Sequence, residues 1–472
     1  HFVILNWNSK VPELVNNLLI KGFKNNVLIL SDKDKEFVTS QINSVLEKGK
    51  RKINLIVKEG NPLMSSTLED ISIEKASSIV VMSREDLFEG DDKNICNADL
   101  FSLKVVLALS DFNYKNNVNI VVETTDESAI EKIKNLSETL QNMKNKNIVP
   151  VSFNKKIGQL ISQTVLTPDL SNVYSDLLSY EGVEFYSYGE DEVDDYLFSH
   201  SSAIPIKKYE KLFVVAEDEK CLPVKRQKLS IHEQKLTIKN YENKENCTVF
   251  VVGNNKKAEY ILENLNLSAS YRGAKLTIKN YAKYELEKLI DDIGHTDGIK
   301  NVIILSDDKV NRDSYDANVF VSLIALQTSF PERNKLNFIT ELLDSRNLNS
   351  VKDFNINNAI ISNKIISLLL TQLALNAESI DFFDNLFIAD SEDGGDVFDI
   401  NVSRASDIID FKDKLEFDSK AEFIHSFYHS FNKDCMPIGY IRNEERIYIS
   451  SDQDEKKKFV IKEDDKIIYI NY

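Results

Sequence analysis

The sequence predicts an α/β protein with two tandem lobes, each a parallel sheet covered by helices on both faces and followed by a small β-rich lobe. Three observations predict this fold class. Short apolar runs alternate with segments of helical periodicity, which is typical of parallel sheets. The first half of the chain matches the second when the sequence is shifted by 247 positions. A stretch rich in β-branched and aromatic residues follows each half.

The first lobe begins with a strand and a helix. Residues 2–5 are apolar and predict a buried strand, and Leu14, Val15, Leu18 and Leu19 continue with helical spacing. Further strands and helices follow in alternation. We expect a strand followed by a charged helix in 27–37, a strand and helix in 53–71, strands in 78–86 and 119–126, and an apolar helix in 98–109.

The second lobe repeats this plan in a shortened form. Residues 2–18 match 249–265, and residues 27–37 match 275–286. Beyond that point the offset falls from about 248 to about 223, so the second copy lacks about 25 residues, the length of one strand and one helix. We therefore expect the second sheet to lack the counterpart of 53–71.

Domain boundaries follow from these matches. Helices at 153–167 and 358–376 lead from each α/β lobe to the β-rich segment behind it, and the first of these segments is reduced to little more than two strands and a helix. The expected domains are a first α/β lobe at 1–152, a crossover helix with a reduced β-rich lobe at 153–220, a polar linker at 221–246, a second, shortened α/β lobe at 247–357, and a crossover helix with a C-terminal β-rich lobe at 358–472.

The turn after the first strand lacks the glycines of a dinucleotide-binding loop. Such a loop has the pattern Gly-x-Gly-x-x-Gly, because backbone amides must approach a pyrophosphate at the helix N-terminus. Here stand Asn6, Trp7 and Asn8, and the second copy has the single glycine Gly253. Asn tolerates left-handed backbone, so Asn6 and Asn8 suit a tight turn, and Trp7 suits a lobe or subunit contact. We expect Rossmann-like lobes that bind no nucleotide.

Composition narrows the function classes. Lys and Arg number 58 against 75 Asp and Glu, a net charge of −17, which argues against a nucleic-acid partner and fits a soluble or cation-binding surface. The most apolar stretch, 365–377, is shorter than the ~20 residues that span a bilayer. Widely spaced cysteines indicate neither a disulfide framework nor a thiolate zinc site and favour an intracellular compartment; they are Cys96, Cys221, Cys247 and Cys435.

Three segments carry motifs in a fixed order. EGNPL and ISIEKAS lie within 59–83, ELLDSRN within 338–370, and IGYIRN within 438–470. On these motifs the chain resembles the cytosolic part of Castor/Pollux-type ion channels over nearly its whole length. The resemblance implies a tetrameric cation channel with a pore N-terminal to this chain, which itself begins at His1. It also implies two RCK-type domains (regulators of potassium conductance) per subunit, which form a gating ring that responds to calcium.

The resemblance implies a regulatory role and no enzymatic activity. The implied partners are further copies of the chain, as a homo-tetramer, and the channel's own transmembrane pore, which attaches this intracellular region to a membrane such as the nuclear envelope. The alternative from another class is a soluble NAD-dependent oxidoreductase or a nucleotide-binding regulatory protein. The sequence contains no Gly-x-Ser-x-Gly motif and no P-loop.

Acidic residues recur at equivalent strand ends in the two lobes. Glu123 and Asp126 end a predicted strand, and Glu341 and Asp344 stand 218 positions later. Open α/β sheets bind ligands at the carboxyl edge of their strands, and calcium takes several carboxylate oxygens. We expect calcium to be the ligand of some of these four acids. The alternative is that they cap the helices that follow.

Two further patterns are compatible with binding sites. Asp32 and Asp34 follow the second strand, where they either join the same crevice or start the next helix. Glu422, His425 and His429 lie on one face of a predicted helix, as zinc ligands do. An amphipathic helix in the C-terminal lobe explains that segment more simply.

Overall fold

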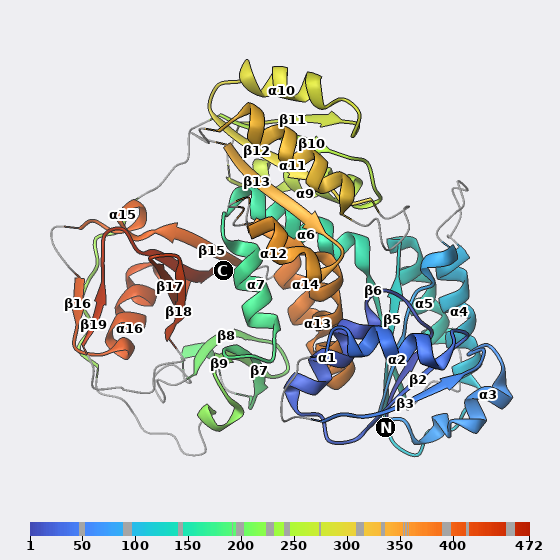
Figure 1. Cartoon of the computed structure of the whole chain (residues 1–472). Coiled ribbons are helices and arrows are strands. Elements are labelled where there is room, and N and C mark those ends of the chain that lie inside the picture. Colours follow the sequence, from blue (N-terminus) through green and yellow to red (C-terminus); the bar gives the residue numbers. More distant parts are fainter. Residues whose placement is uncertain are drawn as a thin grey trace.

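Two parallel sheets, two small β-rich lobes and the helices between them make up the described part of the chain (Figure 1). The structure is a computed structural model. It describes residues 1–46, 52–87, 97–139, 145–190, 192–194, 203–222, 231–239, 246–272, 275–307, 316–331, 336–352, 354, 356, 358–388, 398–411, 415–449 and 458–472.

The first lobe contains a six-stranded parallel sheet in the order β3-β2-β1-β4-β5-β6. Its strands are β1 (Phe2–Leu5), β2 (Asn26–Ser31), β3 (Asn54–Glu59), β4 (Ser78–Val81), β5 (Val118–Thr124) and β6 (Lys146–Ser152). Its helices are α1 (Val11–Lys21), α2 (Lys35–Asn43), α3 (Ser65–Asp70), the 3-10 turns η1 (Ile73–Lys75) and η2 (Glu85–Leu87), α4 (Asn97–Ser110) and α5 (Glu127–Thr139). The central strands are buried on both faces, as parallel sheets require.

The second lobe contains a five-stranded parallel sheet in the order β11-β10-β12-β13-β14. Its strands are β10 (Cys247–Val252), β11 (Leu276–Tyr281), β12 (Ile299–Ile304), β13 (Leu336–Leu342) and β14 (Asn358–Ile361). Its helices are α9 (Lys257–Arg272), α10 (Leu286–Gly294), α11 (Ala317–Ser329), η6 (Ser345–Asn347) and α12 (Leu348–Lys352). Among the described residues no strand pairs beyond β11, where β3 lies in the first sheet, so the predicted loss of one strand and helix is confirmed.

One predicted helix boundary is wrong. The sequence predicts a helix over 358–376, but its first four residues form the edge strand β14. Ile360 pairs with Glu341 in β13, and Ile361 with Leu342, which extends the parallel sheet. β-branched side chains favour this extended backbone, and helical periodicity alone does not register the strand.

The two crossover helices are exchanged between the lobes. α6 (Phe153–Leu166) follows β6 of the first lobe but packs on α9 and β13 of the second, whereas α13 (Ser362–Leu375) follows β14 but packs on α1, β4 and β5 of the first. Both helices lie at the centre of Figure 1. Gly158 allows the close approach of α6 to α9, because a Cβ there would lie 2.7 Å from the Cβ of Tyr260.

A small β-rich lobe follows each crossover helix. The first has α7 (Leu170–Leu178) and an antiparallel sheet in the order β7-β9-β8, one strand more than expected; its strands are β7 (Glu184–Tyr188), β8 (Ile204–Lys208) and β9 (Leu212–Ala216), followed by η4 (Glu219–Cys221). The second has an antiparallel sheet in the order β15-β20-β17-β18 and a separate pair, β16-β19. Its elements are η7 (Ala377–Ser379), α14 (Ile380–Phe387), β15 (Asp399–Arg404), α15 (Ala405–Ile408), β16 (Leu415–Phe417), α16 (Lys420–Ser430), β17 (Cys435–Arg442), β18 (Glu445–Tyr448), β19 (Phe459–Ile461) and β20 (Lys466–Asn471).

A single hydrophobic core connects these parts. It runs from Leu14 in α1 through Leu369 in α13 and Ile161 in α6 to Phe382 in α14 and Phe423 in α16. Smaller clusters fill the other face of each parallel sheet. None of the described helices combines the length and the apolar character needed to cross a membrane.

Candidate functional site

The strand-to-helix turn of the first lobe is held by asparagine. Asn6 adopts left-handed backbone with φ of +79°, and its side-chain amide donates to the Met82 carbonyl oxygen at 3.0 Å. Gly253 occupies the same position in the second lobe with φ of +96°. The predicted left-handed turn residue is confirmed for Asn6, whereas Asn8 has no positive φ and instead accepts a hydrogen bond from the Lys10 amide through its side chain. Trp7 packs edge-to-face on Phe37 of α2 with ring centroids 5.8 Å apart, so it fills a contact within the first lobe.

Glu123 is the centre of a buried polar network in the first lobe. One of its carboxylate oxygens lies 3.1 Å from the ammonium nitrogen of Lys10, and both side chains are buried. The other oxygen accepts hydrogen bonds from the side-chain amide of Asn8 at 2.7 Å and from the backbone amide of Ser83 at 3.0 Å. The carboxylate therefore has three donors inside the protein.

Glu341 is the centre of the same network in the second lobe. Its first oxygen lies 3.2 Å from the ammonium nitrogen of Lys257 and accepts from the Ser362 hydroxyl at 2.6 Å. Its second oxygen accepts from the Asn255 side chain and the Ser306 backbone amide, both at 3.1 Å. Each partner except Ser362 stands at the position that the internal repeat assigns to its counterpart in the first lobe.

The two networks meet at one aromatic ring. The ammonium nitrogens of Lys10 and Lys257 lie 4.4 and 4.7 Å from the ring centroid of Phe153, the first residue of α6. A desolvated ammonium over an aromatic face is attracted by its quadrupole. The second lobe also contacts the first directly through α13, because Asn363 donates to the Ser9 hydroxyl at 3.0 Å. The carboxyl edges of both sheets are thus physically connected.

The backbone amides that a dinucleotide would use have internal partners. The Ser9 amide donates to the Glu85 carboxylate at 3.1 Å, and the Lys10 amide donates to the Asn8 side-chain oxygen at 3.1 Å. The Lys10 ammonium also lies 3.2 Å from Glu85. Burial alone lowers the pKa of Lys10, but the carboxylates of Glu123 and Glu85 raise it above its ordinary value, so the lysine stays charged. This filled turn disfavours the alternative of an NAD-dependent enzyme.

In each lobe a buried aspartate accepts hydrogen bonds from the backbone amides that follow the strand carrying the glutamate. Asp99 accepts from the backbone amides of Thr125 at 2.7 Å and Asp126 at 3.2 Å. Asp316 accepts from the equivalent amides in the second lobe, including that of Asp344 at 3.2 Å. Burial raises the pKa of both carboxyl groups, and these hydrogen bonds oppose that rise.

The four predicted calcium ligands all have protein cations as partners. Glu123 and Glu341 belong to the networks above, and Asp126 lies 3.0 Å from the Lys256 ammonium. Asp344 accepts a hydrogen bond from Nε of the Arg346 guanidinium at 2.9 Å, and it also caps η6 by accepting from the Arg346 backbone amide at 2.9 Å. Among the described residues, none of the four belongs to a group of three or more His, Cys, Asp or Glu side chains close enough to share a metal ion. Calcium binding by these acids stays a prediction.

The other predicted acids have local roles. Asp32 forms an ion pair with Arg84 at 3.0 Å. Asp34 caps α2 by accepting from the Phe37 amide at 2.9 Å, so it starts the following helix, as one of the two interpretations states.

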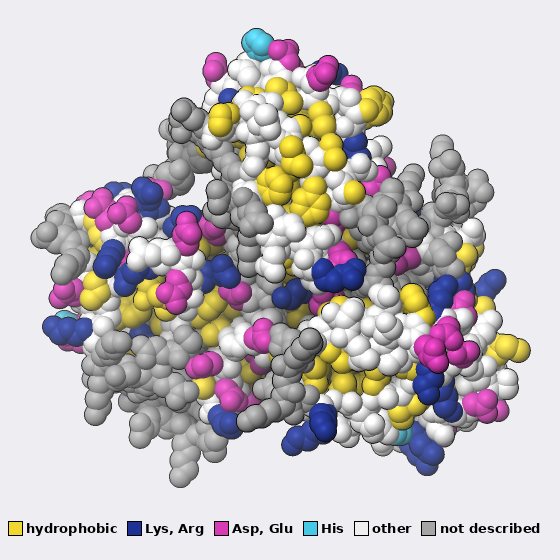
Figure 2. All heavy atoms as spheres, in the orientation of Figure 1, with side chains coloured by type: hydrophobic (Ala, Val, Ile, Leu, Met, Phe, Trp, Pro, Cys, Tyr) yellow, Lys and Arg dark blue, Asp and Glu magenta, His cyan; other side chains and the backbone are white. Residues whose placement is uncertain are grey.

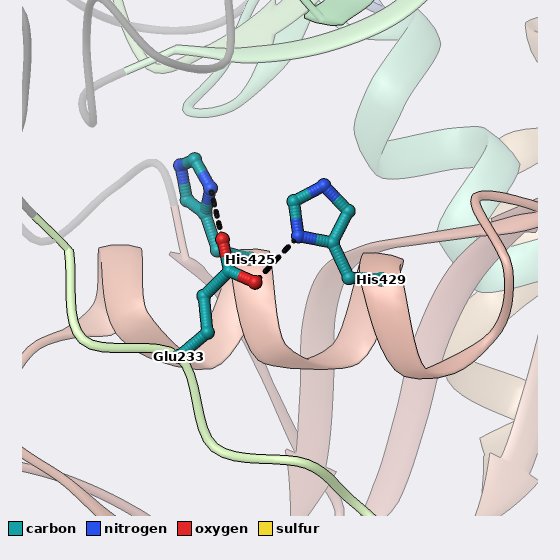
Figure 3. A group of neighbouring side chains, drawn as sticks. All are labelled: Glu233, His425 and His429. Atoms are coloured by element: carbon teal, nitrogen blue, oxygen red, sulfur yellow. Dashed lines mark hydrogen bonds and ion pairs between the residues drawn. The ribbon is translucent and has the colours of Figure 1, made fainter.

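The fold brings together two of the three residues in the predicted zinc pattern on α16, and a different carboxylate takes the place of the third. The expected helix is confirmed, and His425 and His429 lie on one of its faces, but the carboxylate beside them is that of Glu233 (Figure 3). Glu422 instead accepts hydrogen bonds from the Gln234 side chain at 3.0 Å and from the Asp418 backbone amide at 2.7 Å.

Sequence reasoning missed the two lysines and the ring between them. A signal for the lysines was present, because Asn-x-Lys occurs in both copies of the turn, as Asn8 with Lys10 and Asn255 with Lys257. Phe153 carries no such signal, since Ser362 is its structural counterpart after β14.

Comparison with known proteins identifies relatives among plant ion channels. No family model matches the chain. Ion channel DMI1 of Medicago truncatula is 30% identical over 213 residues, which cover 43% of this chain and 22% of DMI1. The probable ion channel POLLUX of Arabidopsis thaliana is 26% identical over 247 residues, 46% of this chain and 28% of that relative. The chain therefore spans about a quarter of the length of the curated relatives it matches. The resemblance to Castor/Pollux-type channels is confirmed over 43–46% of the chain, which is less than the nearly whole length that the motifs predict.

A solved structure shares the fold over the whole chain. The human SLO3 gating ring has a TM-score of 0.64 with this chain at 12% identity, covering 100% of this chain and 98% of that one. The predicted fold class of two tandem Rossmann-like lobes with β-rich lobes is confirmed.

The buried network predicts that removing a buried lysine destabilises the protein more than removing a lysine at the surface. Lys10→Met leaves the Glu123 carboxylate buried without its cation, so we expect the free energy of unfolding to fall by about 3–5 kcal/mol. Lys256→Met is the control, because the Lys256 ion pair with Asp126 lies at the surface and should contribute about 0–1 kcal/mol. Urea unfolding measures both. Equal costs for the two variants would contradict the network's role.

Proposed function

We propose that this chain is the cytosolic regulatory region of a cation channel, in which four copies form a gating ring attached to a transmembrane pore. The observation that carries the proposal is the exchange of crossover helices between two tandem α/β lobes, in a fold that matches a gating ring over its full length. The curated relatives bear ion-channel names. We place the pore in the region of the full channel protein that lies outside this chain.

The shared ring of Phe153 suits a regulatory role. A regulatory domain must couple ligand binding at one place to a conformational change elsewhere. A ligand shifts the equilibrium between two conformations by the difference between its binding free energies for them. Any change at Lys10 or Lys257 acts on Phe153 and therefore on the start of α6. Because α6 packs on the second lobe and α13 on the first, we expect a movement of one lobe to be transmitted to the other.

Apolar faces of equivalent helices provide a surface for assembly. Val321 and Ile324 on α11 are 58% and 54% exposed, and Leu100 and Leu107 on α4 are 38% and 39% exposed. Hydrophobic side chains gather on the face of the second lobe where α11 lies (Figure 2). Exposed apolar patches of this kind mark interaction sites. We assign these faces to contacts with further copies of the chain, because a ring closes when one patch of each copy meets a different patch of the next, and α4 and α11 provide two such patches.

Charge substitution on α11 tests this assembly. We expect the wild-type chain to form oligomers as its concentration rises, and Val321→Asp with Ile324→Asp to shift it toward the monomer, because each buried aspartate would lack a partner. Tyr284→Asp is the control, since Tyr284 is 90% exposed and lies between β11 and α10, outside α11. Light scattering gives the mass. A wild type that stays monomeric, or a double variant that assembles as the wild type does, would contradict the proposed surface.

Calcium is the ligand we propose for the carboxyl edge of the sheets. The net charge of −17 and the recurrence of the four acids support a cation, and the resemblance implies calcium. Glu123 and Glu341 hold lysines, so a calcium ion that binds them must compete with Lys10 or Lys257. That competition would couple binding to Phe153.

Calorimetry tests calcium binding. We expect the wild-type chain to bind calcium, and Glu123→Gln with Asp126→Asn, or Glu341→Gln with Asp344→Asn, to weaken it by at least about tenfold, because each pair removes two of the carboxylates that calcium prefers. Neutral substitutions keep size while removing charge. Binding absent in the wild type at millimolar calcium, or unchanged in both double variants, would show that these acids have only structural roles.

A further inference from the structure

Two histidines and a glutamate from distant parts of the chain converge beside α16. The carboxylate of Glu233 lies between the imidazoles of His425 and His429, which rise from the same side of the helix (Figure 3). Its oxygens are 2.8 Å from Nδ1 of His429 and 3.9 Å from Nδ1 of His425. From this geometry we infer a zinc-binding site that fastens the linker between the two halves of the chain to α16.

The three side chains supply the donors that zinc prefers. Zinc binds imidazole nitrogen and carboxylate oxygen at about 2.0–2.2 Å, so two ligand atoms of a tetrahedral site lie roughly 3.3 Å apart. Here one ligand atom from each residue lies within 4.8 Å of the others. Closing these separations by at most about 1.5 Å completes the site. Rotations of the two imidazoles and of the Glu233 side chain, which is 38% exposed, would provide this closure. Three protein ligands leave the fourth position for water.

The surroundings favour a site that is accessible and specific. His425 is buried, whereas His429 is 25% exposed, so an ion can enter from the side of His429 and Glu233. The spacing of four residues places both imidazoles on one face of the helix, one turn apart. Among the described residues this is the one group of three or more His, Cys, Asp or Glu side chains whose ligand atoms meet in this way.

The linker residues next to Glu233 are also hydrogen-bonded along α16. The backbone amides of Gln234 and Leu236 donate to the hydroxyls of Ser426 and Ser430, each at 2.9 Å. The hydroxyls and the imidazoles form neighbouring stripes on the helix, so the linker runs parallel to its axis. Zinc would add the strongest of these links, because it joins the linker to two turns of α16 at once. Binding of zinc therefore restrains the segment that precedes the second α/β lobe.

Zinc titration of the full chain tests this inference. We expect one zinc ion to bind per chain, and Glu233→Gln or His429→Gln to weaken binding by at least about tenfold. Both positions are partly exposed, so these variants should keep the wild-type melting temperature in the absence of metal. Two controls should bind as the wild type does: Glu422→Gln, which alters the neighbouring carboxylate on α16, and His295→Gln, which alters an exposed histidine paired with Asp291.

Two further readouts separate this site from other zinc ligands. The absorption of bound cobalt(II) should lack the intense near-ultraviolet band of a thiolate ligand, which excludes the cysteines. Hydrogen exchange at the amides of residues 234–236 should slow when zinc is added, because the linker is restrained. Absence of binding at micromolar zinc, unchanged binding in both ligand variants, a thiolate band, or unchanged exchange in the linker would overturn the inference.

Discussion

The buried pairing of Lys10 with Glu123, and of Lys257 with Glu341, is the constraint on which the arrangement of the two lobes depends. A buried charge is tolerated only with an opposite charge and satisfied hydrogen bonds. Asparagine and backbone amides complete each pair in the same way in both lobes. Since both ammonium groups also lie over Phe153, the position of one aromatic ring is fixed by two sheets at once.

This arrangement explains what a Rossmann-like fold does without its phosphate loop. In a dinucleotide-binding lobe the amides at the start of the first helix hold a pyrophosphate. Here the Glu85 carboxylate is an internal partner for the Ser9 amide and the Lys10 ammonium. Charged side chains fill the crevice and connect the lobes, so the sheet edge serves as a contact between the two lobes. Such a contact fits the gating-ring function that we propose.

Much of the fold was predictable from the sequence, because it follows from local pattern. The repeat offset predicts the strands, the missing strand and helix, and the equivalence of Glu123 with Glu341. Asn6 was predictable because few residues tolerate left-handed backbone. The candidate site could be predicted from the sequence only in part. Neither the exchange of α6 and α13 nor the place of Phe153 has a local signal, since both depend on tertiary packing.

The contact between Glu233 and the histidines of α16 shows the same limit. Helical spacing predicted correctly that His425 and His429 share a face, and it placed Glu422 beside them. The fold instead directs Glu422 to Gln234 and Asp418 and delivers Glu233 from the linker, nearly two hundred residues earlier in the chain. Spacing along a helix cannot report which distant segment packs against it.

A double-mutant cycle tests most directly whether Phe153 couples the two lobes energetically. The free energies of unfolding of the wild type, Lys10→Met, Lys257→Met and the double variant give the coupling between the lysines. We expect a coupling of at least about 1 kcal/mol, which disappears when the same cycle is measured with Phe153→Leu in all four chains. Effects that add to within about 0.5 kcal/mol in the presence of Phe153 would contradict this coupling.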